Sequence, residues 1–278
     1  MKEMIEKISN ELGDGYEVNE VTVQKTNGLR DGIQVALKAH PQVGAAFYPN
    51  ADISDDENVE GIVNAVYQEL TPERIREVLR VTEILKDKDF VRSHLQIKMV
   101  NYELNKEWLQ DAIYEPVLDL AAVAYLVLNQ ESDSFESTTL KKGLLPDIGL
   151  SEKEVLDLAK RNMPEPEVLD LMKAVMHPLG EALELGMYVM TNPQKINGAA
   201  YMLSPALKNM ADVSESDLII IPSSIHEIII MKDLGMDKDF LRQMIQEVNA
   251  DSDCLPPDEV LSDHAYVYRR SSQKLESL

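Results

Sequence analysis

Two short apolar runs near the end of the chain constrain its fold more than any other feature. Leu218 to Ile221 and Ile228 to Met231 contain only apolar side chains, and isoleucine dominates both runs. Short, continuous apolar runs that are rich in β-branched residues are typical of central strands, because a buried helix needs a longer periodic segment. Pro222 to Glu227 lies between the two runs, so we expect the three segments to form a hairpin inside a sheet.

A second β-rich region lies at the other end of the chain. Residues 16–38 contain two alternating segments around a glycine-bracketed turn, which predicts a hairpin. The alternation slips near Glu20 and so predicts a β-bulge. Further strands are expected at 45–48, 95–100, 117–128 (one strand or a pair), 187–191, 198–203 and 265–268.

Amphipathic helices separate these strands. Ser54 with Glu57, and Ser151 with Glu154, have the spacing of a capping box and precede apolar residues at helical intervals. A helix is also expected from Val168 to Met176. Asp237 should begin a helix whose buried face comprises Phe240, Leu241, Met244, Ile245 and Val248. The other expected helices span 1–12, 72–85, 107–112 and 206–211.

This order of elements predicts an α+β fold with two modules or lobes, whose antiparallel or mixed sheets are flanked by helices. We expect an N-terminal α+β module at 1–130 and a C-terminal α+β module at 151–270. The C-terminal module should have the sequential order β-β-α-β-β-α-β. Residues 131–150 begin with a polar stretch and are expected to be a linker or long loop, and the tail from Ser271 is expected to be disordered.

The charge of the chain restricts its partners. The formal net charge is -22, which disfavours binding to nucleic acid because the surface repels phosphates, and we expect a protein partner. The segments 52–69 and 247–263 each hold six acidic residues and no Lys or Arg. They are expected to be solvated faces or, alternatively, docking surfaces for a basic partner.

The chain is expected to be a soluble cytoplasmic protein with no contact to a membrane. The longest apolar run, Val117 to Leu128, is too short to span a bilayer, and residues 1–12 lack the features of a signal peptide. Cys254 is the only cysteine, which rules out a disulfide within the chain and fits a reducing compartment. Because Cys254 lies in an acidic stretch, its thiol should have a raised pKa.

Common cofactor and metal motifs are absent from the sequence. It contains no glycine-rich phosphate-binding loop, no zinc-binding pattern of paired His or Cys residues and no nucleophile elbow. The alternating oxygen ligands that start at Asp52 lack the glycine and the bidentate glutamate of a calcium loop. We therefore expect no cofactor and no metal.

The segment between the two apolar runs holds the main candidate site residues: Ser223, Ser224, His226 and Glu227. Functional groups often lie on loops that rigid strands hold in place. The structural alternative is that the serine hydroxyls cap turn amides and that His226 bonds a neighbouring carbonyl. His264, which follows Asp263 just before the last expected strand, is a further candidate. Catalysis by any of these residues requires a nucleophile and a base within hydrogen-bonding distance.

Several segments in the C-terminal half also carry a family resemblance: 188–192, 197–200, 221–227, 248–250 and 261–264. On these segments the chain resembles an uncharacterised bacterial family of gut Firmicutes, a domain of unknown function numbered 5688. The resemblance extends over nearly the whole chain, although the N-terminal half matches mainly in its order of elements. It implies a cytoplasmic bacterial protein and supplies no activity.

Two classes of function remain open. The first is a non-enzymatic binding or regulatory protein that acts through protein contacts, which the missing motifs and the negative charge favour. The alternative is a hydrolase that uses Ser223 or Ser224 with His226, Glu227 or His264. An enzyme should gather these side chains in one concave pocket, whereas a binding protein should separate them and expose an apolar or acidic patch. The oligomeric state stays open.

Overall fold

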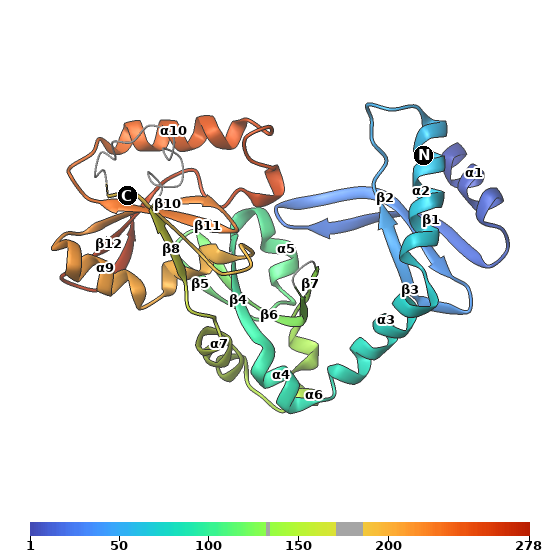
Figure 1. The fold of residues 1–278 in the computed structure, drawn as a ribbon, viewed down its shortest axis with the longest axis horizontal. Helices are drawn as coiled ribbons and strands as arrows, with labels where there is room; N and C mark the ends of the chain where they lie inside the picture. Colours follow the sequence, from blue (N-terminus) through green and yellow to red (C-terminus); the bar gives the residue numbers. More distant parts are fainter. Residues whose placement is uncertain (132–133, 171–185) are drawn as a thin grey trace. The chain divides into compact units, whose positions relative to one another are not determined.

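The computed structural model describes residues 1–131, 134–170 and 186–278 (Figure 1). The chain divides into two compact units, Met1–Phe90 and Val91–Leu278. All strand pairings among the described residues are antiparallel, and helices flank the sheets. The expected α+β class is confirmed.

The first unit packs helices on a three-stranded sheet in the order β1-β2-β3. Its core contains Ile8, Ile33 and Val66, which have no exposed surface. The register runs without a shift from Tyr16 paired with Leu37 to Lys25 paired with Gly28, so the expected bulge near Glu20 is wrong. The elements are α1 (Lys2–Leu12), β1 (Tyr16–Lys25), β2 (Gly28–Leu37), β3 (His40–Phe47), α2 (Asp55–Glu69) and α3 (Pro72–Ile84).

The start of α2 follows the sequence signal. The Ser54 hydroxyl accepts a hydrogen bond from the Glu57 backbone N–H, and the Glu57 carboxylate accepts one from the Ser54 N–H. This reciprocal pair satisfies two amide groups that a helix start otherwise leaves without partners. A short helix that the sequence did not indicate, α4 (Lys88–His94), then leads into the second unit.

The second unit begins with a four-stranded sheet. The long central strand β6 pairs with β4 on one side and with β5 and β7 on the other. The strands are β4 (Leu95–Asn101), β5 (Tyr114–Val117), β6 (Leu120–Glu131) and β7 (Ser134–Thr139). The short helices beside this sheet are η1 (Glu103–Asn105), α5 (Lys106–Leu109), η2 (Lys142–Leu144), α6 (Leu145–Ile148) and α7 (Glu152–Arg161), and Ser151 caps α7 with a second capping box.

The second sheet of this unit has six strands in the order β13-β12-β10-β11-β9-β8. The apolar hairpin lies at its centre as expected, and α9 and α10 lie on its two sides (Figure 1). Ile219, Ile221 and Met231 point toward α10 and pack with Leu241 and Ile245. The elements are β8 (Glu167–Asp170), β9 (Tyr188–Thr191), η3 (Gly198–Leu203), α9 (Ala206–Ser214), β10 (Leu218–Ser224), β11 (Glu227–Lys232), α10 (Lys238–Ala250), η4 (Pro257–Glu259), β12 (Tyr266–Arg269) and β13 (Lys274–Ser277).

For two segments of the second unit, the sequence predicted the wrong type of secondary structure. Residues 198–203 form the 3-10 helix η3 instead of a strand, because Asn197 turns the chain with a left-handed backbone (φ 58°). Val168 and Leu169 belong to the edge strand β8 instead of a helix, since they pair with β9. The remainder of that expected helix, including Met172, Val175 and Met176, lies outside the described residues.

Two segments that were expected to be irregular form strands. Residues 134–139, within the expected linker or loop at 131–150, form β7 and pair with β6. Residues 274–277, within the tail expected to be disordered, form β13 and pair with β12. Both strands lie at a sheet edge, where the backbone can pair while polar side chains face water, so their polar composition is compatible with a strand.

Candidate functional site

The serine, histidine and glutamate candidates surround the tight turn between β10 and β11. Ser224 and Glu227 are paired across the hairpin, so only two residues connect the strands. The Ser224 hydroxyl accepts a hydrogen bond from the backbone N–H of His226 (2.9 Å). The Ser223 hydroxyl donates one to the Glu227 carboxylate (3.3 Å). The first contact is the amide capping expected from the sequence, and both hydroxyls are bonded to groups of the turn itself.

The imidazole of His226 is held by a segment far away in the sequence. The backbone N–H of Asn197 donates to Nδ1 of His226 (3.2 Å). Nδ1 is therefore the unprotonated nitrogen, and Nε2 carries the hydrogen and lies 3.7 Å from Oε1 of Glu259. Since Nδ1 already accepts a backbone N–H, it has no free lone pair to remove a proton from a nucleophile. The sequence predicted a bond from His226 to a neighbouring carbonyl, whereas in the structure Nδ1 of His226 accepts a hydrogen bond from the Asn197 N–H.

The turn meets the β9–η3 connection along its backbone as well. The Thr191 hydroxyl donates to the carbonyl of His226 (2.8 Å), and the backbone N–H of Ala199 donates to the carbonyl of Ile225 (3.2 Å). A Cβ atom at Gly198 would overlap the His226 carbonyl and the Thr191 hydroxyl, so no larger residue fits there. Three of the segments that carry the family resemblance, 188–192, 197–200 and 221–227, therefore converge at one buried point.

His264 belongs to a different network, which is centred on Asp119. The Asp119 carboxylate accepts hydrogen bonds from the hydroxyls of Tyr266 (2.7 Å) and Ser262 (2.8 Å) and lies 3.3 Å from Nε2 of His264. The other ring nitrogen of His264, Nδ1, faces the carbonyl of Ala265 (2.9 Å). Because both ring nitrogens face acceptors, this geometry suits the doubly protonated imidazolium.

The electrostatics of this network agree with its geometry. The hydrogen bond to Asp119 raises the pKa of His264 above its ordinary value, against the opposing effect of burial. Burial by itself would raise the pKa of Asp119, but the hydrogen bonds from His264, Tyr266 and Ser262 outweigh it and lower the pKa to about 2. Asp119 and His264 therefore form an ion pair at pH values between the lowered pKa of Asp119 and the raised pKa of His264, and this pair links the β5–β6 turn to the segment before β12.

The two networks do not bring a serine hydroxyl and an imidazole base together; of the expected hydroxyl–base pairs, the structure forms Ser223 with Glu227. Among the described residues, neither Ser223 nor Ser224 hydrogen-bonds to an imidazole, and the Ser262 hydroxyl bonds the Asp119 carboxylate instead of His264. The sequence did not identify Thr191, Asn197 or Asp119 as members of these networks. The Asn197-Gly198 dipeptide was a usable signal for the turn, whereas no local pattern around Asp119 indicates its partners more than a hundred positions away.

Three further features of the described residues concern metal binding, membrane insertion and thiol chemistry. Within 1–131, 134–170 and 186–278 there is no group of three or more His, Cys, Asp or Glu residues that could hold a metal ion. No described helix combines the length and the apolar character needed to cross a membrane. Cys254 is exposed, and its hydrogen bond to Asp251 raises the pKa of the thiol, as its acidic surroundings predicted.

A concave apolar surface lies between α10 and the six-stranded sheet. This cavity of about 430 Å³, the α10 pocket, has Ser223 and Asn249 as its polar lining residues. The buried face expected for α10 is only partly correct: Leu241 and Ile245 are buried, but Phe240 is 59% and Val248 45% exposed. The apolar lining comprises Met187, Ile221, Pro222, Ile229, Met231, Met236, Leu241, Met244, Ile245 and Val248.

Comparison with known proteins adds one finding. A model described as a family of unknown function (DUF5688) matches residues 1–270. Neither a curated protein nor a solved structure matches the chain.

Proposed function

The chain belongs to the DUF5688 family, and from this premise and the geometry above we propose that it is a non-enzymatic module that binds another protein through the α10 pocket. The observation that carries the proposal is the apolar face of α10, which is wider than the surface that the sheet covers. Leu241 and Ile245 fill the contact with the sheet, while Phe240, Met244 and Val248 remain exposed beside a cavity. Contiguous exposed apolar surface of this kind marks interaction sites.

The lining of the α10 pocket suits a protein segment. Four of its lining residues are methionines: Met187, Met231, Met236 and Met244. Methionine side chains are flexible and polarisable, so they adapt to differently shaped apolar partners. An amphipathic helix that lays its apolar face into this cavity would bury Met244 and Val248 together with its own side chains.

The charge around the pocket indicates a basic partner. The C-terminal half of α10 leads into segment 247–263, which has six acidic residues and no Lys or Arg. Val248 and Asn249 line the pocket at this end of the helix, where the helix dipole also favours cations. The partner segment proposed here is therefore an amphipathic helix with Lys or Arg beside its apolar face. The exposed free thiol of Cys254 is compatible with the cytoplasm as the place of this interaction.

The hydrogen bonds of the two histidines favour this proposal over the hydrolase alternative. Ser223 does line the α10 pocket, and Glu227 accepts its hydroxyl hydrogen. Activation of a serine by histidine needs an imidazole nitrogen with a free lone pair beside the hydroxyl. Nδ1 of His226 is occupied by the Asn197 N–H, and both nitrogens of His264 face acceptors.

The test uses a labelled synthetic helix of leucine and lysine, with leucine on one face, in fluorescence anisotropy titrations. We expect it to bind, and we expect both a scrambled peptide of equal composition and a leucine–glutamate helix to fail. Met244→Ser should weaken binding at least about tenfold, as loss of a central apolar contact does in other interfaces. Val213→Ser is the matched control, since Val213 is 87% exposed on α9, on the other side of the sheet. Equal binding of the scrambled peptide, or unchanged affinity of Met244→Ser, would overturn the proposal.

A further inference from the structure

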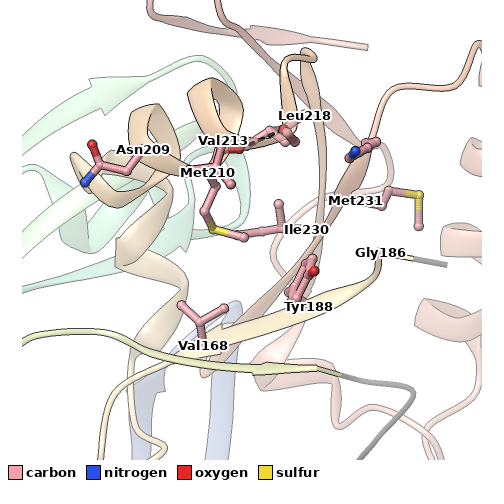
Figure 2. Close-up of a pocket in the computed structure, with 11 residues that line it drawn as sticks. Val168, Gly186, Tyr188, Asn209, Met210, Val213, Leu218, Ile230 and Met231 are labelled. Carbon is pink, nitrogen blue, oxygen red and sulfur yellow. Dashed lines mark hydrogen bonds between the residues drawn. The ribbon is translucent and has the colours of Figure 1, made fainter. Parts of the chain in front are cut away.

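A second cavity lies on the opposite side of the six-stranded sheet, between α9 and the strands. This α9 pocket has a volume of about 420 Å³. Figure 2 shows Met210 of α9 and Val168, Tyr188 and Ile230 of the strands around the same hollow. It is separate from the α10 pocket except for Met231, which contributes to both.

The alternation of the central strands produces this second apolar surface. Leu218 pairs with Lys232, and Ile230 pairs with Tyr188, so these side chains share the face of the sheet opposite the one that packs on α10. The exposed Val213 lies at the same cavity on the helix side. Both the sheet and α9 therefore contribute apolar side chains to the walls.

The charge of the α9 pocket is opposite to that of the chain. In a protein with a net charge of -22, Lys232 is the one charged residue among the described residues that line this pocket, and none of those residues is acidic. Among the described residues, no hydrogen bond or ion pair involves the Lys232 ammonium. The amide of Asn209 and the hydroxyl of Tyr188, which also line the cavity, likewise have no side-chain hydrogen bond to a described residue. Small-molecule sites typically combine apolar walls with a few such convergent polar groups.

We infer that the α9 pocket binds an unbranched aliphatic monocarboxylate. The chain of such a ligand would lie against Val168, Met210 and Ile230, and its carboxylate would pair with the Lys232 ammonium. A single lysine without a second cation matches the single charge of a carboxylate. The inference does not depend on the proposed protein contact, because the two pockets lie on opposite sides of the sheet.

The test is calorimetric titration of the full chain with decanoate, decanol and decylamine below their micelle concentrations. Decanoate should bind, whereas decanol and decylamine, which share its chain length, should bind at least about tenfold more weakly, because they lack the charge-assisted contact. Lys232→Met should weaken decanoate binding by a similar factor. Val213→Asp, which places a negative charge at the cavity, should weaken it as well. Lys232 and Val213 are both exposed, so neither variant should disturb folding.

Matched controls separate the two proposals. Lys238→Met removes an exposed lysine from the start of α10 and should leave decanoate binding unchanged. Met244→Ser should also leave it unchanged, while Lys232→Met should leave binding of the leucine–lysine helix unchanged. Equal affinities for decanoate and decanol would refute the carboxylate site, and so would an equal loss of decanoate affinity in Lys232→Met and Lys238→Met. Neither result would affect the α10 proposal.

Discussion

Replacing Asp119 with asparagine should destabilise the unit Val91–Leu278, and the size of the loss should depend on pH. The Asp119 carboxylate holds the hydroxyls of Ser262 and Tyr266 and pairs with the imidazolium of His264. Asparagine keeps the shape of the side chain but carries no charge and has only one acceptor oxygen. The variant therefore loses the ion pair and one of the hydrogen bonds without creating a cavity.

The magnitude follows from the pKa of Asp119. Its fall from 3.8 to about 2 corresponds to about 2.4 kcal/mol, at about 1.36 kcal/mol for each pKa unit. The Asp119 side chain is 37% exposed, so solvent screens part of this interaction. We therefore expect Asp119→Asn to lower the free energy of unfolding by about 1 to 2 kcal/mol near pH 5 to 6.

The pH dependence has two limbs of opposite sign. Because folding lowers the pKa of Asp119, its contribution is present above pH 3.8 and is lost as the pH falls toward 2. Because folding raises the pKa of His264 above 6.5, its contribution is present below pH 6.5 and is lost as the pH rises through the raised value. The difference in stability between the native chain and Asp119→Asn should therefore be largest between about pH 4 and 6.5.

Urea unfolding followed by tryptophan fluorescence measures this difference. Trp108 is the only tryptophan and lies in the second unit, so its signal reports on that unit and not on Met1–Phe90. Asp157→Asn is the control, since Asp157 is an exposed acidic residue of α7 in the same unit. If Asp119→Asn and Asp157→Asn have equal effects, or if the Asp119→Asn difference stays constant from pH 3 to 9, the reasoning about the ion pair is refuted.

Two further substitutions test the turn at His226 by the same unfolding assay. Gly198→Ala should lower the unfolding midpoint strongly or prevent folding, because its Cβ would overlap the His226 carbonyl. Gly143→Ala is the control and should have little effect, since nothing lies within 4 Å of a Cβ at that position. Similar unfolding midpoints for the two variants would contradict the contact between Gly198 and His226. His226→Ala should lower the free energy of unfolding by about 1 to 3 kcal/mol, because the Asn197 N–H loses its acceptor. His226→Asn should recover part of that loss through its amide oxygen. An unchanged unfolding midpoint in His226→Ala would show that this hydrogen bond contributes nothing to stability.

Elements with a strong local signal were predicted correctly from the sequence. The capping boxes at Ser54 and Ser151 satisfy helix amides within a single turn, so their geometry depends on residues three positions apart. The apolar runs that became β10 and β11 likewise needed only their composition and a turn between them. The prediction failed for segment 198–203, where a left-handed Asn197 and the contacts of Gly198 and Ala199 with the β10–β11 turn decided the backbone.

The candidate site was predictable only in part. The sequence indicated Ser224 and His226 as members of one turn, and the structure adds that the Ser224 hydroxyl caps the His226 amide. It could not indicate that Asn197 occupies Nδ1 of His226, or that His264 pairs with Asp119. These partners are separated by 29 positions in the first case and 145 in the second (264 minus 119), so no local pattern joins them.

The sequence by itself determined the α+β class, the apolar hairpin, the capped helices and the excess of negative charge, because each depends on side-chain composition or on neighbours within one turn of the chain. The tertiary structure alone decided which faces stay uncovered. The amphipathic pattern of α10 predicted one broad buried face, yet only Leu241 and Ile245 of that face are buried, and Lys232 is the one charged residue among the described residues that line an apolar cavity. Burial is a property of what packs against a side chain, and for these residues the packing partners lie on strands that meet only after the chain has folded.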